Sequence, residues 1–170
     1  SFLNRLLKES GDVQTALAAQ APATSALTQA IDRLALNVSH FHQVYDLGVA
    51  RGTFTPAGRA HYGRDITAAT LPALGTIAAI LEAGAQIAPG EAARQTAEGA
   101  AHTAMALPSA AQVAAIHADA AAKYATAETA KLQTDTEQGE AAAASDTASD
   151  PYVFRVARSA VDWTKINRQQ

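Results

Sequence analysis

Residues 24–47 read TSALTQAIDRLALNVSHFHQVYDL and carry the strongest periodic pattern in this chain of 170 residues. Large apolar side chains recur along this stretch at alternating steps of four and three residues, at Leu27, Ile31, Leu34, Val38, Phe41 and Tyr45. This heptad spacing puts all six side chains on one face of an α-helix. We therefore expect a helix from Thr24 to Leu47 that buries this face in the chain's own core or against a partner, and we take the six residues as candidate interaction residues.

The composition around this helix favours further helices. Hydrophobic residues make up 48% of the chain, but most of them are alanine and large apolar side chains are scarce. Alanine is the best helix former, and it lets two helix backbones approach closely. No segment shows the sustained alternation typical of a strand. The sequence predicts an all-α fold, an elongated alanine-rich bundle of about five or six helices with a C-terminal amphipathic tail.

Turn signals on the N-terminal side predict two short helices. Ser10-Gly11-Asp12 ends the first, over residues 2–9, and Asp12 caps a second that runs to Ala21-Pro22. After the heptad helix, Gly48 and Gly52 mark its end. Thr55-Pro56 then opens another helix, because proline is favoured at the first helical position.

The remaining helices are divided by prolines. Residues 66–88 are expected to form a buried helix with a kink or restart at Leu71-Pro72, and Pro89-Gly90 is expected to stop it. A helix of small residues would follow over 91–107, and Ser109 would begin a longer one.

A change of composition predicts three parts along the chain. Residues 1–138 would form the helical bundle domain, and residues 139–150, rich in alanine, serine and acidic side chains, a low-complexity linker. Residues 151–170 would form a C-terminal docking helix with candidate interaction residues Tyr152, Val156 and Trp163. Because this segment is basic and aromatic, we expect it to dock on an acidic or apolar groove, either of its own bundle or of a neighbour.

Charge and motifs argue against several classes of function. A formal net charge of −3 gives no basic footprint for nucleic acid, and the absence of cysteine excludes disulfides and thiolate catalysis. No phosphate-binding glycine loop, nucleophile elbow or catalytic triad is recognisable. We expect no enzyme, no catalytic residues and no cofactor.

Metal binding is one alternative. Glu98 and His102 are four residues apart and would share a helix face, which is a spacing that can hold a metal ion. A carboxylate-bridged di-metal bundle needs further Glu-x-x-His motifs, which the sequence lacks. We therefore assign no metal ligands and keep a small helical metal-binding protein as the second alternative.

A membrane-active protein is the first alternative. Residues 66–88 are the most apolar long stretch, but Glu82, Pro72 and Gly75 interrupt them, and a spanning helix needs about 20 apolar residues. A secreted or membrane-active protein would insert through this segment.

One short pattern is similar to a known signal. Tyr124-x-x-x-Glu128 is similar to the Tyr-x-x-x-Asp/Glu secretion signal of mycobacterial type VII substrates, and residues 114–130 resemble the corresponding stretch of their PE proteins. The similarity covers one helix, and the Trp-x-Gly hairpin of that family does not precede it.

The leading hypothesis is a structural or interaction subunit of a large protein assembly, such as a bacteriophage virion. We expect protein partners, in a homo-oligomer or a larger complex. The sparse core, the close-packing helices and the aromatic tail favour this hypothesis.

Overall fold

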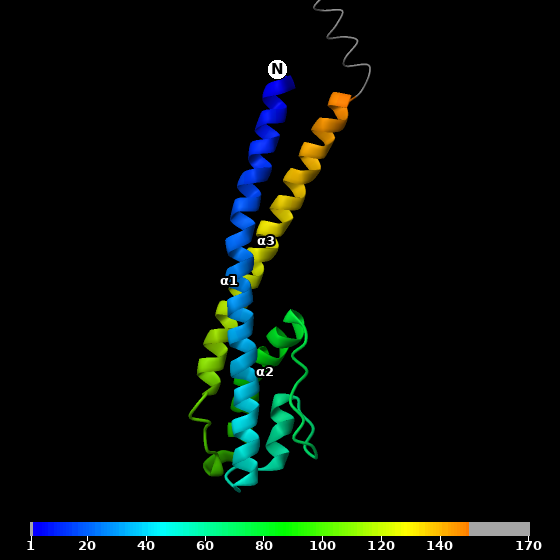
Figure 1. The fold of residues 1–170 in the computed structure, drawn as a ribbon. Coiled ribbons are helices and arrows are strands. Elements are labelled where there is room, and N and C mark those ends of the chain that lie inside the picture. The colour runs from blue at the N-terminus through cyan, green and yellow to red at the C-terminus, as the bar shows by residue number, and fades with distance from the viewer. Residues whose placement is uncertain (1, 150–170) are drawn as a thin grey trace, which may run out of the picture. The chain divides into compact units, whose positions relative to one another are not determined.

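The computed structural model describes residues 2–149, and these residues form helices and no strands (Figure 1). The elements in order are α1 (Phe2–Ala50), the 3₁₀ helix η1 (Pro56–Tyr62), α2 (Ile77–Glu98), the 3₁₀ helix η2 (Gly99–Ala101) and α3 (Ala110–Ser149). The all-α prediction is confirmed. Over these residues the chain makes three α-helices and two short 3₁₀ helices in place of the five or six helices expected, and the tail over 151–170 lies outside them.

The chain divides into two compact units, which we describe separately. Of the described residues, 2–22 and 128–149 belong to the terminal unit, and residues 23–127 belong to the central unit. Helices α1 and α3 each contribute to both units. The domain boundaries expected at 138 and 150 stay a prediction.

The two short N-terminal helices that the sequence predicted are instead part of one continuous helix, α1. Gly11 is exposed, and a glycine inside a helix costs only about 1 kcal/mol. Pro22 is also inside α1 and exposed, so water can reach the carbonyl group that the proline leaves without a donor. The packing of the buried face of α1 therefore outweighs the unfavourable effects of Gly11 and Pro22 on the helix.

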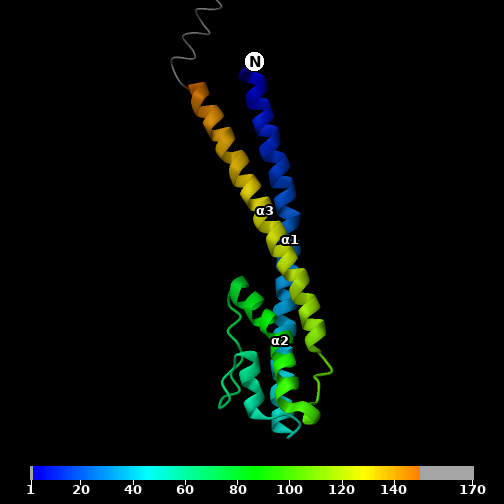
Figure 2. The same ribbon diagram turned by 180° about the vertical axis from the view of Figure 1, so that it is seen from behind.

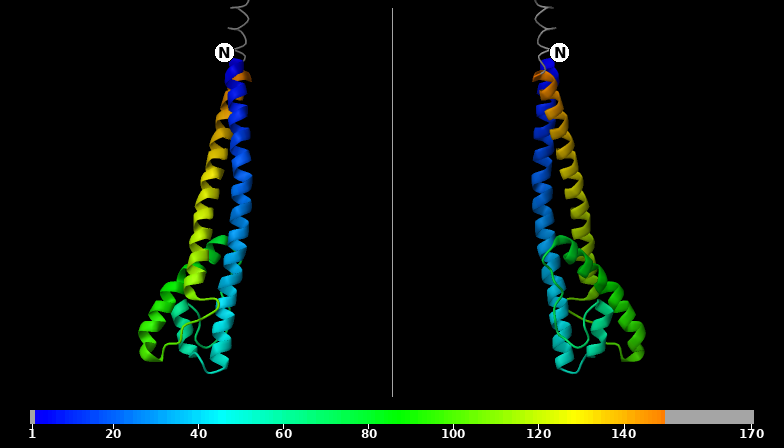
Figure 3. Two further views of the ribbon diagram at one scale, coloured as in Figure 1. Left: turned by 90° about the vertical axis from the view of Figure 1, so that its left-hand side faces the viewer. Right: turned by 90° about the vertical axis from the view of Figure 1, so that its right-hand side faces the viewer.

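The terminal unit pairs the first half of α1 with the second half of α3; the two overlap in the views of Figure 3 and draw apart toward their outer ends in Figure 1. The most buried side chains of this unit are small: Ala16 is 3% exposed, Ala144 is 2% and Thr134 is 3%. Small residues allow close approach of two backbones but bury little apolar area. The pair therefore has a thin core.

The central unit contains the larger core. The heptad residues of α1 pack there with Tyr62, Ile80 and Ile87, with Met105, and with Val113 and Ala120 of α3. Gly84 of α2 makes room for Leu34, because a Cβ at Gly84 would lie 3.0 Å from that side chain. The helix predicted from Thr24 to Leu47 is thus present, within the longer α1.

Residues 63–76 are not helical, contrary to the expectation of a helix over 66–88 (Figure 2). Arg59 donates a hydrogen bond to the carbonyl of Ile66, and Arg64 donates one to the carbonyl of Thr70, both at 3.1 Å. These carbonyl groups are therefore held by side chains instead of by a helix. Within residues 2–149 no helix is long and apolar enough to cross a membrane.

Helix α2 begins where Thr76 accepts a hydrogen bond from the amide of Ala79, and it continues through Pro89-Gly90, where the sequence predicted a stop. Pro89 is exposed, so the carbonyl of Ala85 that loses its donor is open to water. Gly90 is buried against the backbone of His61, and a Cβ there would lie 2.4 Å from the His61 carbonyl oxygen. The helix predicted over 91–107 is thus the end of α2, which stops at Glu98.

Helix α3 begins after Ser109, as expected. The Ser109 hydroxyl accepts from the Gln112 amide at 3.2 Å, and the Gln112 side chain accepts from the Ser109 amide at 2.8 Å, which is a reciprocal capping box. The helix continues to Ser149, so residues 139–149 are helical where a linker was expected. Alanine and the remaining polar residues of that segment favour a helix as well as they favour a linker.

Candidate interaction surface

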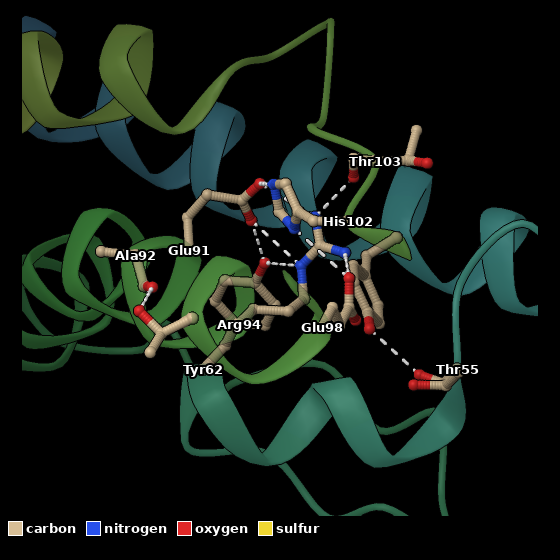
Figure 4. A network of polar contacts seen from close by, with 10 residues as sticks. Thr55, Tyr62, Glu91, Ala92, Arg94, Glu98, His102 and Thr103 are labelled. Carbon is tan, nitrogen blue, oxygen red and sulfur yellow. Dashed lines mark hydrogen bonds and ion pairs between the residues drawn. The ribbon is translucent and has the colours of Figure 1, made fainter. Parts of the chain in front are cut away.

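Arg94 of α2 lies at the centre of a buried polar cluster in the central unit (Figure 4). Its side chain is fully buried, and the carboxylates of Glu91 and Glu98, one turn away on the same helix, lie 2.9 Å and 2.8 Å from its terminal nitrogens. Its Nε donates to the hydroxyl oxygen of Tyr62 at 2.9 Å, and one terminal nitrogen donates to the carbonyl of Thr103 at 2.7 Å. The arginine therefore joins η1, α2 and the loop after η2.

Two aromatic rings cover the guanidinium group. Its central carbon is 5.0 Å from the ring centre of Phe54 and 5.6 Å from that of Tyr45, and the two rings are stacked at 4.9 Å. The Tyr45 hydroxyl passes over Gly58, where a Cβ would collide with it, and donates to the carbonyl of Thr55. This cation–π arrangement excludes water from the arginine.

The ionisation of the cluster follows from these contacts. Burial alone would raise the pKa of Glu91, but hydrogen bonds from Arg94 and Tyr62 outweigh burial and lower the pKa. Burial, together with the hydrogen bond to Glu91, raises the pKa of the Tyr62 phenol. Glu91 is therefore a carboxylate and Tyr62 a neutral donor, and the donors of Arg94 are occupied by protein acceptors. The cluster therefore holds η1, α2 and the loop after η2 together.

A second buried ionic group lies where α1 meets residues 59–64. Asp46 of α1 accepts from Arg59 Nε at 2.8 Å and from Arg64 at 2.6 Å. Burial opposes ionisation of Asp46, but the hydrogen bonds from both arginines outweigh it and lower the pKa of the carboxyl group. One carboxylate thus pairs with two buried guanidinium groups and anchors the non-helical segment on α1.

The pair Glu98 and His102, chosen from the sequence as a possible metal site, is close together as expected. His102 Nδ1 lies 3.3 Å from a Glu98 carboxylate oxygen, and its Nε2 lies 3.4 Å from Glu91. The same Glu98 oxygen is bonded to Arg94, so a cation already occupies this position. Arg94 was not identified from the sequence. Its only sequence signal was Glu91, three residues before it, and Glu98, four residues after it.

The carboxylates of Glu9, Asp12 and Glu137 in the terminal unit lie within 4.8 Å of one another and could hold a metal ion. Arg5 lies 3.9 Å from Glu9, and Lys8 lies 3.3 Å from Asp12. These cations already offset part of the negative charge.

An open groove lies between α1 and the start of α3 in the central unit. Arg33, Asn37 and His40 line it from α1, and Leu107, Pro108, Gln112, Ala115 and Ile116 line it from the start of α3 and the loop before it. Its volume is about 550 Å³. We call this hollow the α1–α3 groove.

Large apolar side chains are exposed at this groove. Leu107 lines it and is 69% exposed. Leu36 does not line the groove, but it is 70% exposed and lies one helical turn from the lining residues Arg33 and His40. Among the described residues, Arg33 has no ion-pair partner. The groove thus combines apolar area with an available guanidinium group, a composition typical of protein-binding surfaces.

The residues predicted to mediate interactions fall into two groups. Leu27, Ile31, Leu34, Val38, Phe41 and Tyr45 are all buried in the core of the central unit, with Leu27 the most exposed at 8%. Tyr152, Val156 and Trp163 lie outside the described residues. Tyr124 of the Tyr-x-x-x-Glu pattern lies in the middle of α3, and its side chain is 38% exposed.

Comparisons with models of known protein families, with curated proteins and with solved structures found no match to this chain.

Proposed function

We propose that this chain is a non-enzymatic structural or interaction subunit of a larger protein assembly. The observation that carries the proposal is the exposure of Leu107 in the α1–α3 groove and of Leu36 one helical turn from the lining residues Arg33 and His40. Each leucine would gain about 1.5–3 kcal/mol if it were fully buried. A partner that covers the groove would supply this burial.

The polar chemistry of the central unit supports the same proposal. Its two buried ionic groups, around Arg94 and Asp46, are occupied by contacts within the chain. The α1–α3 groove is open to solvent, whereas small-molecule sites enclose most of their ligand. A bacteriophage virion is one assembly of the proposed kind, and that choice rests on composition alone.

The experiment is a measurement of solution mass by light scattering behind a sizing column, with a helicity spectrum on the same peak. For a self-assembling subunit we expect a mass above the 17.5 kDa of one chain. The double variant Leu36→Lys/Leu107→Lys should return the mass to one chain while helicity is kept. Leu132→Lys is the matched control, because Leu132 is 68% exposed and lies outside the groove.

Two results would count against this proposal. A helical monomer at every concentration would contradict self-assembly and leave only a foreign partner. A multimer that both sets of variants leave intact would show that the groove is not the interface.

A further inference from the structure

The terminal unit has a groove of its own. Leu6, Glu9, Ser10, Val13 and Gln14 of α1 line it together with Ala141 of α3, and its volume is about 350 Å³. We call it the terminal groove. Leu6 and Val13 are only half-buried, and Leu17, one turn beyond Val13, is 44% exposed. One apolar edge of the helix pair is therefore uncovered.

We propose that residues 151–170 of the same chain occupy the terminal groove and complete the helix pair as its third element. This proposal goes beyond the assembly function and does not depend on it, since the terminal groove and the α1–α3 groove share no residues.

Charge complementarity is the first argument. The described part of the terminal unit, residues 2–22 and 128–149, has seven acidic side chains against Arg5, Lys8 and Lys131, a formal charge of −4. Residues 151–170 have four basic side chains against Asp162, a formal charge of +3. Glu9 brings a carboxylate into the groove itself. The two parts attract each other over distances up to about 10 Å at ordinary ionic strength.

The second argument is the position and length of the segment. Residue 151 follows closely on the end of α3 at Ser149, and Ala141 lies eight residues before that end, about 12 Å along the helix. A helix of the length of residues 151–170 spans about 30 Å, enough to turn back and cover the groove. A short tether gives the segment an effective concentration in the millimolar range, which favours its own chain over a second copy.

The third argument is the need for apolar area. The helix pair is held by small side chains such as Ala16, Thr134 and Ala144, whereas residues 151–170 contain Tyr152, Phe154 and the only tryptophan of the chain, Trp163. Large aromatic side chains contribute most of the energy where helices dock in grooves. The segment thus provides large aromatic side chains to a pair whose most buried residues are small.

Trp163 makes the experiment simple, because it is the only indole in the chain. Its emission maximum and its quenching by acrylamide would be recorded on the full chain across a range of concentrations. We expect a blue-shifted, poorly quenched indole at every concentration, including those where the chain is a monomer by light scattering.

Two variants test the contact from either side. Ser10→Arg places a bulky cation in the groove, and Arg155→Glu/Arg158→Glu reverses charge in the segment while it leaves the groove intact. Both should shift the emission to that of a water-exposed indole, with the helicity kept. Thr15→Arg is the matched control, because Thr15 is exposed on the same helix and does not line the groove. It should leave the emission unchanged.

Several results would overturn the proposal. The first is the emission of a water-exposed indole in the unchanged chain. A blue shift that appears only when the mass doubles would show that the occupant is the segment of a second copy. A blue shift that survives both groove and segment variants would place Trp163 elsewhere.

Discussion

The phenol of Tyr62 connects two charged groups: its oxygen accepts from Arg94 Nε at 2.9 Å, and its hydroxyl donates to the Glu91 carboxylate. Tyr62 closes η1 and Arg94 lies inside α2, 32 residues further along the chain. Removing one member of such a buried network leaves the others with uncompensated charge or unpaired polar atoms.

Arg94→Met should therefore destabilise the chain strongly. The carboxylates of Glu91 and Glu98 would lose their shared cation, and loss of one partner from a buried ion pair costs about 3–5 kcal/mol. Urea unfolding followed by circular dichroism would measure this loss. Arg51→Met is the control, because Arg51 is exposed and should change stability by less than about 0.5 kcal/mol. Equal losses in the two variants would refute the structural role of the cluster.

Asp46→Asn should destabilise the chain by a comparable amount, about 3–5 kcal/mol. The substitution leaves Arg59 and Arg64, whose side chains are 9% and 3% exposed, without a counter-ion. The measurement is again urea unfolding. The triple variant that also carries Arg59→Met and Arg64→Met should recover part of the loss, because no buried charge then remains unpaired. No recovery would mean that the non-helical segment is held by the hydrogen bonds from the two arginines to its backbone carbonyls, and not by their ion pairs with Asp46.

The sequence predicted the large core better than the helix ends. All six heptad residues from Leu27 to Tyr45 are buried, because large side chains at helical spacing have few other uses, whereas the buried Ala30 and His42 were not identified by this pattern. The helix ends were harder, because Pro22 and Pro89 lie inside helices at exposed positions. Local signals give the cost of a proline but not the tertiary packing that offsets it.

The polar clusters were harder still to predict. Glu98 and His102 were found because they are four residues apart, whereas Tyr62 meets Arg94 only through the packing of η1 on α2. The same is true of Asp46, whose partners are 13 and 18 residues away. Contacts between elements of this kind leave no periodic pattern in the sequence.

Replacing glycine by alanine should change the stability of the chain in opposite directions at Gly90 and at Gly11. At Gly90, a Cβ would lie 2.4 Å from the His61 carbonyl oxygen and 2.7 Å from the Tyr62 ring. Gly90→Ala should thus cost at least about 1–3 kcal/mol through overpacking. At Gly11, inside α1, nothing lies within 4 Å, so Gly11→Ala should stabilise by about 0.5–1 kcal/mol. Thermal unfolding would show shifts of opposite sign, and a gain at both positions would contradict the close contact at Gly90.

His42 should make the stability of the chain fall with pH in mildly acidic solution. The side chain is buried, 1% exposed, and its Nδ1 has no hydrogen-bond partner. Burial, and next the positive charge of Arg64, lower its pKa from 6.5 to about 4, against the opposing effect of Asp46.

The direction of this change follows from the number of protons that the folded and unfolded chains bind. Between pH 6.5 and pH 4 the unfolded chain binds a proton at His42 that the folded chain does not bind, so the free energy of unfolding falls as the pH falls, by about 3 kcal/mol in total. Urea unfolding at pH 7, 6, 5 and 4 would measure this slope. His42→Phe keeps an aromatic ring beside Phe41 and Tyr62 and should remove most of the slope above pH ~4.5, since carboxyl groups begin to contribute only near their own pKa values of about 4. An unchanged slope in His42→Phe would mean that His42 accepts its proton in the folded chain.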